Sequence, residues 1–268
     1  MSVDLWWFAF VVLGLFAGFL AGLLGLGGGA VMVPLLASLF DAQGVAREQV
    51  LHLALGTSMA TIVFTSLSSL RAHHRHGAVL WPVVRDLTPG IVLGTFLGTL
   101  VAARISTHGL ALFFACFILV VAVQMALNLK PKAARDLPGR PGMIATGTGI
   151  GGVSALVAIG GGSLTVPFLT WCNVPVQRAI GTSAATGLPI AFFGTLGYLW
   201  NGWAAPNLPA FSIGYVYLPA LALVMGGSVL TAPLGARLAH RLPVATLKRV
   251  FSAVLVLLAA QMLYRLFR

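Results

Sequence analysis

Charged residues are scarce in this chain, and the shortage decides its class. Only 8% of the 268 residues are Asp, Glu, Lys or Arg, whereas 59% are hydrophobic and the mean hydropathy is +0.98. A soluble domain needs roughly one quarter charged residues to cover its surface. The composition therefore excludes a soluble fold and predicts an all-α polytopic membrane protein, with residues 1–268 forming a single transmembrane domain.

Acidic residues are the scarcest charged class. The five acids are Asp4, Asp41, Glu48, Asp86 and Asp136, and all fall in loops or at the ends of apolar segments. An acid in the middle of a membrane is costly and is kept mainly for function. Because no acid stands at that depth to bind a cation or relay a proton, the pattern favours an anionic substrate. Backbone carbonyls remain an alternative way to hold a cation.

Other chemistry is excluded by what surrounds the polar residues. The net charge of +11 lies in loops between apolar runs, as in membrane proteins, so no nucleic-acid partner is expected. Cys116 and Cys172 give no disulfide framework or metal spacing, and we expect no cofactor. The histidines at 73, 74 and 76 indicate a solvated basic loop, with a metal site as the alternative. No catalytic residue is expected, because no base accompanies a serine inside a segment.

Two long apolar stretches are each interrupted by three glycines. Leu5–Phe40 contains Gly27, Gly28 and Gly29, and Gly142–Trp171 contains Gly160, Gly161 and Gly162. Glycine triplets break helices, so each stretch is predicted to be a hairpin of two helices. Six further runs have the length of a membrane span: 51–70, 79–102, 109–129, 179–200, 211–236 and 244–266.

The sequence repeats itself once. A polar linker, 130–141, separates repeat one (5–129) from repeat two (142–266), and LGGGAVMVPLL at 26–36 matches IGGGSLTVPFL at 159–169. A Gly-Thr-Ser triplet follows each motif. We therefore expect two related halves, each a glycine-broken hairpin followed by about three transmembrane helices, giving 8–10 membrane segments.

The distribution of Lys and Arg predicts how the halves are oriented. If each glycine-broken stretch re-enters on one side, twelve basic residues collect on one face and four on the other; if each crosses fully, the split is seven against nine. The first split is the bias expected of a cytoplasmic face. It predicts inverted repeats and both termini on the side opposite the cytoplasm.

The glycine breaks and the Gly-Thr-Ser triplets are the candidate substrate-binding site. Free N–H groups at a helix start attract anions, and hydroxyls donate to an oxyanion without the desolvation cost of a charge. The candidate residues are Gly27, Gly28, Gly29, Ala30, Thr57, Ser58, Gly160, Gly161, Gly162, Ser163, Thr182 and Ser183. The alternative is structural, with glycines that allow close packing and hydroxyls that bond to helix carbonyls.

Other residues remain secondary. Gly14/Gly18/Gly22 and Gly90/Gly94/Gly98 have the spacing of helix-packing glycines and could also contact a second copy of the chain in a homo-oligomer. His52 lies near the start of its segment, where it could titrate, but it has no counterpart in the second half.

The paired motifs, Gly25–Leu36 with Gly56–Ser58 and Gly160–Leu169 with Gly181–Ser183, resemble those of the TauE/SafE family of sulfite exporters. The resemblance covers nearly the whole chain. It implies a secondary transporter in a bacterial cytoplasmic (inner) membrane, with both termini on the periplasmic side, that exports small sulfur-containing anions such as sulfite, sulfoacetate or other sulfonates. A proton or another ion could be coupled to transport. An anion channel and a non-transporting membrane assembly subunit are the alternatives.

Overall fold

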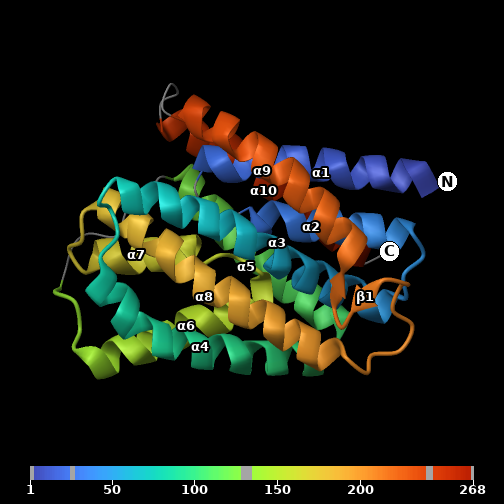
Figure 1. The fold of residues 1–268 in the computed structure, drawn as a ribbon, viewed down its shortest axis with the longest axis horizontal. Coiled ribbons are helices and arrows are strands. Elements are labelled where there is room, and N and C mark those ends of the chain that lie inside the picture. The colour runs from blue at the N-terminus through green and yellow to red at the C-terminus, as the bar shows by residue number, and fades with distance from the viewer. Residues whose placement is uncertain (1–2, 25–27, 128–134, 240–243, 267–268) are drawn as a thin grey trace.

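The computed structural model of the chain is a helical bundle (Figure 1). It describes residues 3–24, 28–127, 135–239 and 244–266. The described residues form ten helices, α1 (Val3–Leu24), α2 (Gly29–Ala42), α3 (Arg47–Arg75), α4 (Trp81–Arg104), α5 (Thr107–Ala126), α6 (Arg140–Val157), α7 (Gly162–Trp171), α8 (Val176–Gly202), α9 (Leu218–Ala239) and α10 (Val244–Leu266). They also form one antiparallel pair of two-residue strands, β1 (Ser212–Ile213) and β2 (Val216–Tyr217). The predicted all-α membrane fold is confirmed.

Helix lengths separate full spans from half spans. Within the described residues, α3, α4, α5 and α8 are long and apolar enough to cross a membrane. By contrast, α2 has 14 residues and α7 has 10. At 1.5 Å per residue these helices reach roughly 21 and 15 Å, less than the hydrocarbon core of about 30 Å. Each therefore spans only part of the membrane, and each begins within the bundle, directly after a glycine break.

Both members of a glycine-broken pair return to the end of the bundle from which they started. The ring centroids of Phe10 in α1 and Phe40 in α2 lie 6.0 Å apart, so the start of α1 lies beside the end of α2. In the second half, α6 starts and α7 ends at the opposite end. Both chain termini lie at the right of Figure 1.

The two halves interlock through parallel helix pairs. A Cβ built at Gly14 of α1 would lie 2.6 Å from the Val224 carbonyl oxygen of α9, and Ser228 of α9 donates to the Gly14 carbonyl at 3.1 Å. A Cβ at Gly98 of α4 would likewise lie 2.6 Å from the Gly152 carbonyl oxygen of α6. The first helix of each half thus packs along the fourth helix of the other half.

These contacts decide the role of the spaced glycines. Each of Gly14, Gly18, Gly90, Gly94 and Gly98 faces the backbone of the neighbouring helix, so the predicted packing role is confirmed for them. The same contacts occupy their faces within one chain, and these glycines are not available to a second copy.

Helices α3 and α8 cross the centre of the bundle in opposite directions. Gly194 of α8 lies against the side chain of Met59, while Gly187, seven residues earlier, lies near Ser66 of α3. Their N-terminal parts, which carry the two Gly-Thr-Ser triplets, consequently lie towards opposite ends of the molecule.

Candidate functional site

Each glycine break begins its short helix with a left-handed glycine. Gly28 has φ 73° and precedes α2, and Gly161 has φ 79° and precedes α7. Side chains with a Cβ rarely adopt such angles, so these two positions require glycine. The Gly28 carbonyl accepts the N–H of Met32 at 3.0 Å, and the Gly161 carbonyl accepts that of Thr165 at 2.7 Å. The two breaks therefore have the same local geometry.

The two breaks meet inside the bundle, between α3 and α8. A Cβ added to Gly29 would overlap the Ala158 carbonyl oxygen and would lie 3.0 Å from the Ile62 side chain of α3. A Cβ at Gly187 of α8 would lie 2.5 Å from the Gly160 carbonyl oxygen. We call this meeting point, formed by 28–30 and 158–163, the glycine junction. Of the candidate residues, Gly27 lies outside the described residues.

The start of α7 presents polar groups to the glycine junction. Within the part of the chain that the structure describes, the backbone N–H groups of Gly162 and Ser163 have no hydrogen-bond partner. The Thr165 hydroxyl is fully buried, also has no partner there, and lies 3.4 Å from the point that a Cβ on Gly161 would occupy. Free N–H groups at a helix start carry partial positive charge, which suits an anion.

The Gly-Thr-Ser triplets bind the opposite half of the chain. The Thr57 hydroxyl oxygen accepts the N–H of Tyr217, and that of Thr182 accepts the N–H of Leu80, both at 3.0 Å. Each donor stands directly before the fourth helix of the other half. We call these two contacts the first and the second clasp.

The glycine of each triplet makes the clasp possible. A Cβ on Gly181 would lie 2.6 Å from the Ala78 carbonyl oxygen, and one on Gly56 would overlap the Tyr215 carbonyl oxygen. Each threonine oxygen therefore already accepts one main-chain N–H, and the group that it still has for an anion is its hydroxyl hydrogen.

The two serines of the triplets differ. Both are buried, but Ser183 donates to the Ile180 carbonyl at 2.8 Å, whereas the Ser58 hydroxyl has no partner within the described residues. A buried hydroxyl without a partner costs about 1–3 kcal/mol, and a ligand or water would recover that cost. Ser58 is thus the triplet residue best placed to contact a ligand.

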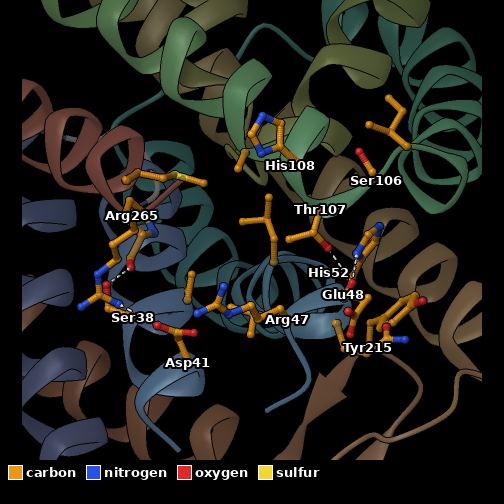
Figure 2. Close-up of a pocket in the computed structure, with 18 of the residues that line it drawn as sticks. Ser38, Asp41, Arg47, Glu48, His52, Ser106, Thr107, His108, Tyr215 and Arg265 are labelled. Carbon is orange, nitrogen blue, oxygen red and sulfur yellow. Dashed lines mark hydrogen bonds and ion pairs between the residues drawn. The ribbon is translucent and has the colours of Figure 1, made fainter. Parts of the chain in front are cut away.

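A cavity of about 1130 Å³ opens at the end of the bundle that holds the chain termini. Figure 2 shows polar side chains that line it. The polar lining residues come from α2, α3, α4, α5 and α10, from the turn before α5 and from the loop before β2. Its charged and titratable lining residues are Asp41, Arg47, Glu48, His52, Arg104, His108, Tyr215 and Arg265. We call this cavity the vestibule.

The vestibule stops short of the glycine junction. Its floor includes Leu51 and His52 of α3, while Ile62 of the same helix touches Gly29. Eleven residues of helix separate Leu51 from Ile62, a distance of roughly 16 Å. The first clasp and Ser58 lie between them. The candidate residues are therefore not one cluster: the junction residues meet, while the triplets lie on either side of them.

Sequence reasoning missed the vestibule, although a signal was present. Arg47, Arg104 and Arg265 are three of the four basic residues that charge counting places on the less basic face. Because charge counting places these three arginines on the same side of the membrane, they could have been expected to lie near one another. No sequence pattern indicated Tyr215. It lies between β1 and β2, just before α9, and lines the cavity from there.

Metal ligands do not gather in the described ranges. There, no three His, Cys, Asp or Glu side chains lie close enough to hold a metal ion. The two described cysteines are free, with Cys116 exposed and Cys172 buried.

Comparison with known proteins gives a consistent result. Residues 10–262 match the model of the family described as sulfite exporter TauE/SafE. A probable membrane transporter protein of Haemophilus influenzae is 38% identical over 260 residues, which cover 95% of this chain and 98% of that protein. Probable membrane transporter proteins of Bacillus subtilis and Methanocaldococcus jannaschii are 27% and 28% identical and cover 95% and 91% of the chain, and 96% and 91% of those proteins, respectively. No solved structure matches the chain.

Proposed function

The chain belongs to the TauE/SafE sulfite exporter family and is a multi-pass membrane transporter; from this premise we propose that it exports small sulfur-containing anions such as sulfite, sulfoacetate or other sulfonates. Transport is secondary and works by alternating access across the glycine junction. The anion is held there by main-chain N–H groups and hydroxyls instead of charged side chains.

One observation carries this proposal: two short helices start from left-handed glycines at the same buried place. The starts of α2 and α7 are buried, and α7 presents the free N–H groups of Gly162 and Ser163. Broken helices in corresponding positions of two repeats are typical of the substrate sites of transporters. Irregular backbone survives at membrane depth only where protein or a water-filled cavity shelters it. The glycine junction has paired broken helices and an irregular backbone that is sheltered by protein, so it is a suitable place to bind an anion.

The vestibule supports alternating access. It brings solvent to the floor at Leu51 and His52, while the packed first clasp separates that floor from the junction. An anion in the vestibule would reach the junction when the Thr57 to Tyr217 contact opens. A corresponding opening at the second clasp would release it on the other side.

The charge distribution supports the proposed orientation. The vestibule end carries the chain termini and the less basic set of connections, which the positive-inside rule assigns to the periplasm. On this assignment the halves are inverted repeats in a bacterial inner membrane. The opposite starting points of α1 and α6 support the same arrangement.

Reconstitution tests the proposed function. Purified protein in liposomes is expected to carry radiolabelled sulfite or sulfoacetate down a gradient, with saturation and with competition between sulfonates. A channel would show flux without saturation or counter-flow, and an assembly subunit would show no flux. If neither anion moves in either direction, the proposal is wrong.

A matched pair of variants tests the junction. Gly161→Ala should strongly reduce flux, because it strains the backbone that positions the start of α7. Gly44 also has a positive φ, 79°, but has nothing within 4 Å of a Cβ and lies in the loop after α2. Gly44→Ala introduces comparable backbone strain away from the junction and from both clasps, and should leave flux near the original rate. Equal flux in the two variants would show that the backbone at Gly161 is not required for transport and that this glycine serves packing alone.

A further inference from the structure

His52 is a buried titratable side chain at the floor of the vestibule. It lies in the second turn of α3, and only 5% of its surface is exposed. Figure 2 shows it beside Tyr215, with Glu48 and Thr107 close by. This histidine lies outside the glycine junction and takes no part in holding the anion there.

Both nitrogens of the His52 ring face main-chain carbonyl oxygens. Nε2 lies 2.9 Å from the Ala102 oxygen at the end of α4, and Nδ1 lies 3.3 Å from the Glu48 oxygen one turn earlier in α3. A carbonyl oxygen can only accept a hydrogen bond, and a neutral imidazole has a single N–H to donate. Only the protonated ring satisfies both contacts. The neutral ring leaves one nitrogen lone pair facing an oxygen.

The charges around His52 link its proton to an anion. The groups that face the cavity are Arg47 and Glu48 from its own helix, Asp41 from α2, Arg104 from α4, His108 from α5, Arg265 from α10 and Tyr215 from the loop before β2. Arg265 pairs with Asp41 at 3.5 Å. Three arginines therefore face two acids, and a proton on His52 adds to the positive excess. An anion in the vestibule balances that added charge, so proton and anion stabilise one another.

His52 also touches the parts that must move. Its ring lies 5.1 Å from the ring of Tyr215, whose carbonyl oxygen packs against Gly56 in the first clasp. Its Nε2 contact is with the last turn of α4, at Ala102. Loss of the proton leaves one ring N–H, so His52 keeps either its contact with α4, through Ala102, or its contact within α3, through Glu48. The contact that can be lost to α4 lies next to the barrier between vestibule and junction.

From this geometry we infer that His52 is the proton-binding site of the transporter, occupied together with the anion, and that transport is therefore coupled to protons. The inference rests on the proposed function and names its coupling ion. Because one proton moves with a doubly charged anion, the pair carries net negative charge, and the inside-negative membrane potential drives that charge outward in the proposed direction of export.

The test measures exchange and accumulation in the same liposomes. Sulfoacetate is the probe, because its two acid groups stay ionised between about pH 6 and 8. Potassium and valinomycin hold the membrane potential at zero. With one proton per anion, a one-unit pH gradient should accumulate sulfoacetate up to about tenfold in the unaltered protein. An internal pH dye should record one proton moved with each anion.

His52→Gln keeps a donor for the Ala102 carbonyl but cannot take up a proton. We expect it to exchange labelled for unlabelled sulfoacetate at equal pH with a raised KM, because the anion loses its partner charge, while its accumulation in a pH gradient falls to about onefold. His76→Gln, in the exposed turn after α3, is the control and should still accumulate the anion.

Three outcomes overturn the inference. Accumulation by His52→Gln equal to that of the unaltered protein removes His52 from the proton path. Net uptake of sulfoacetate by the unaltered protein without any proton movement overturns coupling even if the variant fails to fold. Absence of exchange by the unaltered protein, with sulfite as well as with sulfoacetate, overturns the proposed function and this inference with it.

Discussion

The first and second clasps make the same contacts at opposite sides of the molecule, but their surroundings differ. In each, a glycine admits a carbonyl of the other half and the following threonine accepts an N–H two residues further on. The first clasp lies beneath the vestibule, and its Ser58 hydroxyl has no partner in the described part of the chain, whereas beside the second clasp Ser183 donates to a helix carbonyl. One repeated device therefore occupies two environments.

This difference distinguishes the structural role common to both clasps from the ligand contacts available at only one of them. The elements that the halves share, glycine and threonine, hold the halves together. What differs is the hydrogen bonding of the two shared serines and the presence of His52 and the vestibule side chains on one side only, and these groups can meet a ligand. At the clasps the shared glycine and threonine therefore report on architecture, whereas at the glycine junction the shared sequence itself forms the proposed site.

The largest loss should come from filling a clasp. Gly56→Val and Gly181→Val each drive side-chain atoms into main chain of the other half, which cannot move aside cheaply, and overpacking of this kind costs roughly 1–3 kcal/mol or more. Both variants should melt several degrees lower in detergent, by tryptophan fluorescence. Gly149→Val is the control, because a Cβ at Gly149 meets nothing within 4 Å. A melting point for either clasp variant equal to that of the control would show that the clasp does not hold the halves together.

Removing a clasp hydroxyl should lower stability less than filling the clasp, and by a similar amount on the two sides. Thr57→Val and Thr182→Val each leave a main-chain N–H unpaired, at a cost of about 1–3 kcal/mol. We expect similar losses of thermal stability from the two. A large difference in melting temperature would contradict the equivalence of the clasps.

Truncating the serines should distinguish the two sides most clearly. Ser58→Ala removes a hydroxyl without a partner, so stability should stay within about 1 kcal/mol or rise, while the KM for the anion increases if Ser58 meets it. Ser183→Ala removes a bond to a helix carbonyl and should leave KM unchanged. The measurement is saturable flux in liposomes, and equal KM values in the two variants would contradict the asymmetry.

The smallest effect is expected at the vestibule rim. The Asp41 and Arg265 side chains are 48% and 44% exposed, and such pairs contribute only about 0–1 kcal/mol. Asp41→Asn should leave the melting temperature nearly unchanged and should lower KM modestly at low salt, because Arg265 is freed to attract the anion. If the lower KM persists at high salt, the effect is not electrostatic attraction.

Much of the fold was predictable from the sequence, because it rests on local signals. Long apolar runs, the glycine triplets and the repeated motifs depend on neighbours in the chain, and the described helices confirm the all-α membrane fold. The packing role of Gly14 and Gly94 also follows from their helical spacing.

The site was predictable only in part. The glycine triplets were marked by their own chemistry, but the partners of Thr57 and Thr182 lie 160 and 102 residues away along the chain. Pairing over such distances is set by the packing of whole helices and leaves no local pattern. For the same reason the carbonyl of Ala102, which gives His52 its significance, could not be found from the sequence.

The parallel pairing of α1 with α9 constrains how the chain is made. The glycine face of α1 leaves the ribosome first, but the helix that fills it follows about 200 residues later, roughly 10–40 s at ordinary rates of synthesis. During that interval the glycine face of α1 has no partner helix. The same order means that neither half, synthesised alone, contains the partner of its first helix. Biogenesis of this protein is therefore complete only when the last quarter of the chain has been inserted.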